Sequence, residues 1–75
     1  MKELVEYMVK SLVENPDQVE VREIDGTRSV IFEVRVAQED MGRVIGKGGR
    51  VANAMRTLLR VAAIRQGKRA ILEIV

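Results

Sequence analysis

The chain has 75 residues, a formal net charge of +2, and 47% hydrophobic residues. It contains no Cys and no His, which excludes disulfides, thiolate metal sites and the commonest general base. A chain this short buries only about 60% of the surface that its unfolded form exposes, so we expect one small domain, residues 1–75, without a sizeable ligand cavity. These exclusions argue against an enzyme and against a metal or cofactor site.

Charge is divided unevenly along the sequence. Residues 1–40 contain five Lys or Arg and ten Asp or Glu, a balance of −5, whereas residues 41–75 contain eight basic residues and one acidic residue, a balance of +7. The basic half is a candidate face for a polyanion. Because no apolar run approaches the roughly 20 residues that cross a bilayer, and the N-terminal segment is charged, we expect a soluble, cytoplasmic protein.

The first predicted element is an amphipathic helix over residues 2–14. Apolar side chains recur along it every three or four positions: Leu4, Val5, Met8, Val9, Leu12 and Val13. Asn15-Pro16 ends this helix, because the residue before a proline is disfavoured in the helical region. Two strands follow, over residues 18–24 and 28–36, and Asp25-Gly26 between them is a strong hairpin signal.

The second strand alternates between two kinds of side chain, as a half-buried strand does. Its apolar face comprises Val30, Phe32, Val34 and Val36, and the other face comprises Ile31, Glu33 and Arg35. Val19 and Val21 extend the apolar face onto the first strand. The only aromatic residues, Tyr7 and Phe32, are expected in the interior or on the sheet face.

The second half of the chain predicts two helices and a strand. A helix of about two turns, with Met41, Val44 and Ile45, is cut off by the glycines at 46, 48 and 49. A long helix then runs from about Arg50 to Gln66. Its predicted buried stripe comprises Val51, Met55, Leu58, Leu59 and Ala62. A last strand, from Ala70 to Val75, is apolar enough for burial on both faces. The order α-β-β-α-α-β predicts an α+β domain whose three-stranded sheet has helices packed on one face.

The segment Gly46-Lys47-Gly48-Gly49 between the two helices carries the functional signal. Three glycines in four residues permit a tight turn that exposes backbone N–H groups at the start of the next helix, where the helix dipole adds partial positive charge. A phosphate is the natural complement of such a site. Lys47 within the turn, and Arg43 and Arg50 on either side, add charge at the same place.

Two other phosphate loops do not fit. A Walker A loop needs four residues between its glycines and a Ser or Thr after its Lys, but Gly42 and Gly46 enclose three residues and Gly48 follows Lys47. A dinucleotide-binding loop starting at Gly46 requires glycine where Val51 stands, and it must follow a strand. The G-x-x-G loop of KH domains lies between two helices and clamps about four nucleotides by their backbone.

The run Val44-Ile45-Gly46-Lys47-Gly48-Gly49-Arg50 closely resembles the core of the KH superfamily, and the element order resembles the type II KH fold. The segment Asp40-Met41-Gly42-Arg43-Val44-Ile45-Gly46-Lys47 and the ending Ile71-Leu72-Glu73-Ile74 look like the KhpA (YlqC) family of small bacterial RNA-binding proteins. This resemblance implies an RNA chaperone in post-transcriptional regulation, with effects on cell shape. It also implies a homodimer, or a heterodimer with a KhpB-like KH protein.

By resemblance, the loop holds the backbone of single-stranded RNA while the bases lie in a narrow apolar groove. The matching positions are Val44, Ile45, Val51 and Ala52, with Ile31 or Val34 on the strand side. For Ile45 and Val51, packing in the core is an equally good interpretation. Single-stranded DNA stays an alternative ligand, since no residue of the sequence specifically indicates a contact to a 2′-hydroxyl group.

A protein-interaction module is the alternative function. In that case the domain dimerises and binds RNA only together with its partner. The candidate contact surfaces are the N-terminal helix and exposed small residues of the long helix, such as Ala63.

Overall fold

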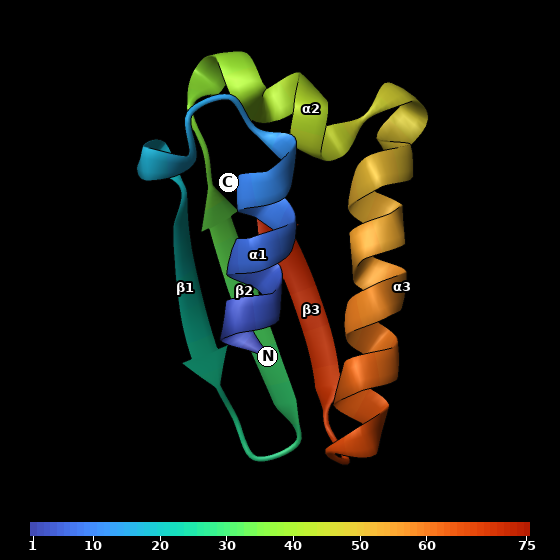
Figure 1. The fold of residues 1–75 in the computed structure, drawn as a ribbon. Helices are drawn as coiled ribbons and strands as arrows, with labels where there is room; N and C mark the ends of the chain where they lie inside the picture. Colours follow the sequence, from blue (N-terminus) through green and yellow to red (C-terminus); the bar gives the residue numbers. More distant parts are fainter.

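The computed structural model describes all 75 residues, and its elements follow the predicted order (Figure 1). The helices and strands are α1 (Lys2–Leu12), β1 (Glu20–Asp25), β2 (Ser29–Arg35), α2 (Met41–Ile45), α3 (Arg50–Arg65) and β3 (Arg69–Ile74). Three short 3₁₀ turns complete the chain: Pro16–Gln18, Gln38–Asp40 and Lys47–Gly49. The last of these turns lies in the glycine-rich segment between α2 and α3.

The three strands form one mixed sheet in the order β1-β2-β3. A hairpin joins β1 and β2, which pair antiparallel, with Val21 opposite Val34. Strand β3 pairs parallel with β2, with Phe32 opposite Leu72. A parallel pair needs a long crossover connection, and here that connection carries α2, the glycine-rich segment and α3. Because β2 is central, the outer edge of β3 is free of strand partners.

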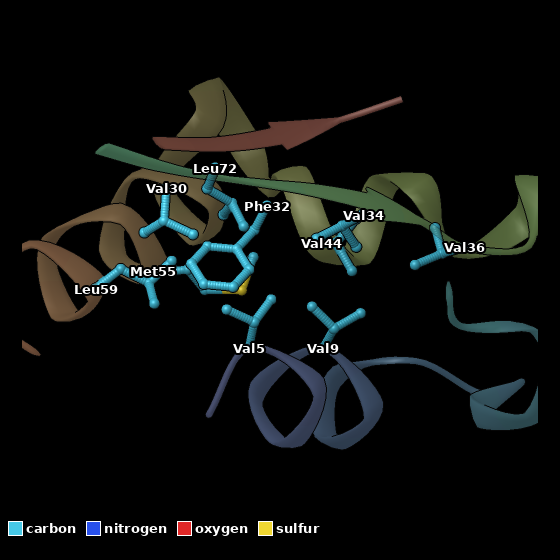
Figure 2. Packing of buried hydrophobic residues seen from close by; sticks show 10 residues of the cluster. All are labelled: Val5, Val9, Val30, Phe32, Val34, Val36, Val44, Met55, Leu59 and Leu72. Atoms are coloured by element: carbon cyan, nitrogen blue, oxygen red, sulfur yellow. The ribbon is translucent and has the colours of Figure 1, made fainter. Parts of the chain in front are cut away.

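The core lies between one face of the sheet and the helices. Residues Val30, Phe32 and Val34 of β2 are buried and point toward Val5 and Val9 of α1 (Figure 2). The alternation predicted for this strand is therefore confirmed. The rest of the buried hydrophobic cluster comprises Val36, Val44, Met55, Leu59 and Leu72.

One prediction about a helix end and two predictions about burial were wrong. Helix α1 ends at Leu12 rather than at residue 14, because Val13 already has an extended backbone (φ −97°, ψ 161°). Tyr7 is 73% exposed and belongs neither to the interior nor to the sheet face. Strand β3 is not buried on both faces: Leu72 is its only buried residue, since no helix covers the opposite face of the sheet.

The buried face of α3 also differs from the predicted stripe. Leu58, predicted to be buried, is 57% exposed, whereas Ala63, predicted to be exposed, is only 1% exposed. The buried positions are Ala52, Met55, Leu59 and Ala63. Small side chains on this face let α3 approach the sheet closely, and larger apolar side chains of the same helix are left on its outer surface. The structure contains no helix that is both long and apolar enough to span a membrane.

Candidate nucleic-acid interface

Asp40 fixes the position of α2 relative to the end of α1. Its side chain is 1% exposed, and its two carboxylate oxygens accept hydrogen bonds from the amides of Glu14 and Asn15, each at 3.1 Å. The Asn15 side-chain amide donates a third bond at 3.0 Å. The backbone amide of Glu14 is the main cause that holds the pKa of Asp40 below its ordinary value of 3.8, although burial acts in the opposite direction.

The glycine-rich loop has a backbone that glycine alone adopts easily. Gly46, Gly48 and Gly49 all have positive φ, at 75°, 65° and 80°. Gly46 combines its φ with a ψ of 169°, a region that is essentially restricted to glycine. The three glycines therefore permit the tight path of the chain from α2 into α3, as the sequence predicts, and Gly46 has the most restricted backbone of the three.

Backbone amides of the loop are left available for a ligand. Within the loop, Gly46 N donates to Gly42 O at 2.9 Å and Gly49 N donates to Gly46 O at 3.1 Å. None of the backbone hydrogen bonds outside the regular elements uses the amide of Lys47 or of Gly48. Both amides precede the N-terminus of the 16-residue helix α3, whose dipole favours an anion at this end.

The three cations predicted around the loop are in different situations. Lys47 and Arg50 are exposed and take part in no ion pair. Arg43 is held by protein carboxylates instead: its Nη2 lies 2.6 Å from Glu14 Oε1, and its Nε lies 4.0 Å from Asp40 Oδ1. Two cations at the loop, Lys47 and Arg50, are thus free to meet an anionic ligand. The third, Arg43, would be available only if the ligand displaced its carboxylate partners.

The predicted apolar wall of the groove is only partly accessible. Val44 and Ala52 are buried, so they support the loop from inside the protein. Ile45 is exposed, and Val51 is half-buried and packs against the core cluster and Gly46. Of these positions, Ile45 and Val51 are the ones with surface that a base can reach.

The strand side predicted for the groove, on β2, has no free edge in the structure. Val34 is fully buried, and Ile31 lies on the face of the sheet that the helices do not cover. Both belong to the central strand, whose edges are occupied by its two neighbours. The free strand edge beside α3 belongs to β3, where Arg56 Nε donates a hydrogen bond of 3.2 Å to Leu72 O.

Two polar residues of α3 were missed as candidates for the site. Asn53 follows Gly49 by one helical turn, and its Oδ1 accepts a 3.1 Å hydrogen bond from Arg56 Nη1. Asn53 and Arg56 thus continue the line of the loop along α3 toward the free edge of β3. The four-residue spacing of Arg56 and Arg60 was a visible signal, but the sequence does not say which sheet edge they approach.

A mixed three-stranded sheet, helices on one face, and a G-x-x-G loop between the second and third helices together define a KH domain of type II. The family model for the KH domain of KhpA and KhpB matches residues 2–74. The chain belongs to this family, which is a family of RNA-binding KH proteins.

Individual relatives agree with this assignment. The chain is 57% identical over 75 residues to the RNA-binding protein KhpA of Caldanaerobacter subterraneus subsp. tengcongensis, with 100% of both chains covered. It is 52% identical, with the same coverage, to the RNA-binding protein KhpA of Clostridium acetobutylicum. Among solved structures, it resembles part of Era from Aquifex aeolicus, bound to GDP and aluminium fluoride, with a TM-score of 0.65 and 19% identity. That match covers 97% of this chain and 28% of the Era chain, and it shows the fold alone.

Proposed function

We propose that residues 1–75 act as a single KH domain that binds single-stranded RNA by its backbone, with Gly46, Lys47, Gly48 and Gly49 as the clamp. The observation that carries the proposal is the loop itself. It presents two unpaired amides and an exposed Lys at the N-terminus of α3, in a backbone that glycines adopt most easily. Arg50 adds charge, Ile45 and Val51 contact bases, and Arg43 and Val44 support the loop.

The cellular role that fits such a clamp is that of an RNA chaperone and post-transcriptional regulator in the cytoplasm. Backbone contacts carry little sequence information, so one protein can hold many different RNAs. Modest base preference is expected because neither aromatic residue lies in the loop. Single-stranded DNA should bind more weakly than RNA if the groove contacts 2′-hydroxyl groups.

The direct test replaces Lys47 and Gly48 with Asp in one variant, Lys47→Asp/Gly48→Asp. A Cβ atom at Gly48 would meet nothing within 4 Å, and Asp tolerates the left-handed conformation better than most residues, so this variant should fold. Its two carboxylates would face the RNA phosphates. We expect the affinity for a short single-stranded RNA, measured by fluorescence anisotropy at two salt concentrations, to fall by roughly 100-fold or more.

A control with the same change in charge is available away from α2. Lys2→Asp/Gly26→Asp alters the exposed start of α1, near the N-terminus, and the turn between β1 and β2, which lies at the opposite end of the sheet from α2 (Figure 1). This control should lose far less affinity than the loop variant. Equal losses in the two variants, or full binding by a folded loop variant, would contradict the clamp.

A second candidate function is supported by a separate observation on α3. Leu58, Val61 and Ile64 recur every three residues on its outer surface, and each is more than half exposed. Exposed apolar patches of this kind mark association surfaces. We propose that this stripe, in place of Ala63, mediates a homodimer or a heterodimer with a KhpB-like KH protein.

Sedimentation equilibrium at several concentrations tests the homodimer. Wild type should show a concentration-dependent dimer, and Val61→Glu should be a folded monomer at the same concentrations. RNA binding by the Val61→Glu monomer would then show whether the clamp works alone or needs a partner. A wild type that stays monomeric throughout would leave only the heterodimer to be tested by mixing with a KhpB-like protein.

A further inference from the structure

Asp40 is the only buried residue of the fold that has a polar side chain. Burial of a carboxylate is costly unless hydrogen bonds replace the lost water, and here no buried side-chain oxygen or nitrogen lacks a partner. A well-packed apolar side chain in place of a buried charge often gives an equally stable protein. A fully bonded carboxylate at this position therefore points to a role in fixing geometry, in addition to stability.

The carboxylate of Asp40 does not cap the helix that it precedes. Asp is among the preferred residues at a helix N-cap, where its side chain accepts a bond from an amide of the first turn. Asp40 stands at the N-cap of α2 but makes no such bond. Its oxygens instead accept bonds from the amides of Glu14 and Asn15 and from the Asn15 side chain. The carboxylate thus connects α2 to a segment 25 and 26 positions earlier in the chain.

Helix α2 is held in place by few buried side chains. It has five residues, and a helix of this length is unstable in water without tertiary contacts. Val44 is its only buried residue, and Met41 is only partly buried. The helix is therefore anchored at two points, by Val44 in the core and by Asp40 just before its first residue. Loss of the Asp40 anchor would leave α2 free to pivot about Val44.

The direction of α2 is passed on to the glycine-rich loop, which begins where this helix ends (Figure 1). Gly46 is the C-cap of α2, and its amide donates a 2.9 Å hydrogen bond to Gly42 O inside the helix. The amides of Lys47 and Gly48 follow directly. A rotation of α2 therefore changes the direction in which these two free amides point.

We infer that Asp40 is a positioning residue for RNA binding, which holds α2 against residues 14 and 15 and so keeps the amides of Lys47 and Gly48 arranged for a phosphate. The inference rests on the clamp proposed for residues 46–49. Asp40 itself touches no RNA, because its carboxylate is buried and occupied by protein donors. A preformed loop binds more tightly, since the ligand does not have to order it.

The effect of Asp40→Asn on RNA binding has opposite signs in the two possible accounts. This variant removes one negative charge near Arg43, whose Nε lies 4.0 Å from Asp40 Oδ1. Electrostatics alone would therefore strengthen the binding of a polyanion. Displacement of the loop would weaken it, because the apparent dissociation constant rises in proportion as the competent arrangement becomes rarer. If about one molecule in ten keeps that arrangement, binding becomes about tenfold weaker.

The test measures RNA affinity and loop structure separately in Asp40→Asn. Fluorescence anisotropy with a short single-stranded RNA, at a low temperature where circular dichroism shows a folded variant, should give about tenfold weaker binding than wild type. Without RNA, the amide NMR signals of Lys47 and Gly48 should shift, although neither amide is bonded to Asp40. Asn15→Ala removes only the side-chain bond to Asp40 and should weaken binding about twofold. This milder variant carries the test if Asp40→Asn does not fold.

Val30→Ala is the matched control for lost stability. Val30 is buried on β2 away from Val44 (Figure 2), so the truncation destabilises the domain without touching α2. A merely structural residue does not change the affinity of the molecules that remain folded. Val30→Ala should therefore bind RNA as wild type does, with unshifted signals of the loop amides.

The other outcomes overturn the inference. Unchanged or tighter RNA binding by a folded Asp40→Asn variant would restrict this residue to stability, and so would equal weakening by Val30→Ala. Weaker binding with unshifted loop signals would mean that Asp40 does not act through the loop. A wild type that binds no RNA would contradict the clamp itself, which is a separate result because it does not depend on Asp40.

Discussion

Arg43 Nη2 lies 2.6 Å from Glu14 Oε1, so the cation that precedes the glycine-rich loop is tied to the segment after α1. Both side chains are exposed, and a surface pair of this kind contributes only about 0–1 kcal/mol to stability. The pair nevertheless neutralises Arg43 locally, whereas Lys47 has no such partner. Proximity to the loop in the sequence therefore does not make the two residues equal in RNA binding.

The first prediction is a difference between two alanine variants. Lys47→Ala should weaken binding of a short RNA by roughly 5- to 10-fold. Arg43→Ala should weaken it by only about twofold, since the charge of Arg43 is already balanced by the Glu14 carboxylate. Fluorescence anisotropy at a fixed salt concentration measures both. As a control, Glu14→Gln should raise the affinity slightly by freeing Arg43. A larger loss with Arg43→Ala than with Lys47→Ala would show that the ion pair opens on binding.

The second prediction contrasts two glycines of the loop. A Cβ atom at Gly46 would lie 2.5 Å from Val51 Cγ2 and 2.8 Å from Val51 N, whereas one at Gly48 would meet nothing within 4 Å. Gly46→Ala should therefore lower the free energy of unfolding by roughly 2–3 kcal/mol, from overpacking and backbone strain together. Gly48→Ala should cost about 1 kcal/mol, from its left-handed backbone alone.

Urea denaturation of the two glycine variants, followed by circular dichroism, gives the comparison. Both variants expose the same domain on unfolding, so the free energy of unfolding should fall with urea concentration at the same slope in both. The urea midpoints of the two variants should differ. Similar midpoints would mean that Val51 moves aside at little cost. RNA binding by Gly46→Ala should also fall, because the loop cannot keep its path past Val51.

The third prediction concerns acid stability and Asp40. The folded-state pKa of Asp40 lies below its ordinary value of 3.8, so its contribution to stability is present above that value and is lost as the pH falls through the folded pKa. Asp40→Asn removes this contribution and leaves an amide that cannot accept all three hydrogen bonds. We expect a melting temperature about 10 °C lower near pH 7.

A pair of melting series, from pH 7 down to pH 2, separates Asp40 from the other carboxylates. The difference in melting temperature between wild type and Asp40→Asn should narrow below about pH 4, where wild type begins to lose the same interactions. Glu39→Gln, an exposed neighbour, serves as the control and should follow wild type throughout. A gap that stays constant down to pH 2 would show that the charge of Asp40 contributes nothing.

The fourth prediction is a strong salt dependence of RNA binding. If the loop and its flanking cations contact three to five phosphates, the logarithm of the affinity should fall with the logarithm of salt concentration at a slope of about 2 to 3.5. Titrations between roughly 50 and 300 mM salt measure that slope. An affinity that does not change over this range would contradict binding through the backbone and would favour contacts with bases alone.

The sequence predicts the element order and the loop well because both depend on local signals. Alternation in β2 and the glycines at 46, 48 and 49 are read from neighbouring residues alone. The buried face of α3 was predicted wrongly at Leu58 and Ala63, because apolar residues occupy more than one face of this helix and their spacing does not say which face meets the sheet. In the structure, the side of α3 that lies close to the sheet is the buried side, and it includes Ala52 and Ala63.

Side-chain partners far apart in the sequence were not predictable in the same way. Asp40 looks like an acidic residue at a helix start, yet its carboxylate binds amides about 25 positions earlier. Arg56 reaches a strand edge that is free only because β2, and not β3, lies in the centre of the sheet. Such contacts depend on the assembled topology, which spacing along the chain does not encode.

The parallel pairing of β2 with β3 also has a kinetic consequence. Partners such as Ser29 and Arg69 lie 40 positions apart, and contacts at such separation slow folding because the intervening chain must be closed into a loop first. The glycine-rich loop is part of that intervening chain. We therefore expect the proposed phosphate clamp to form only when the last strand joins the sheet, and an isolated α2–α3 segment should have the right sequence without a lasting binding site.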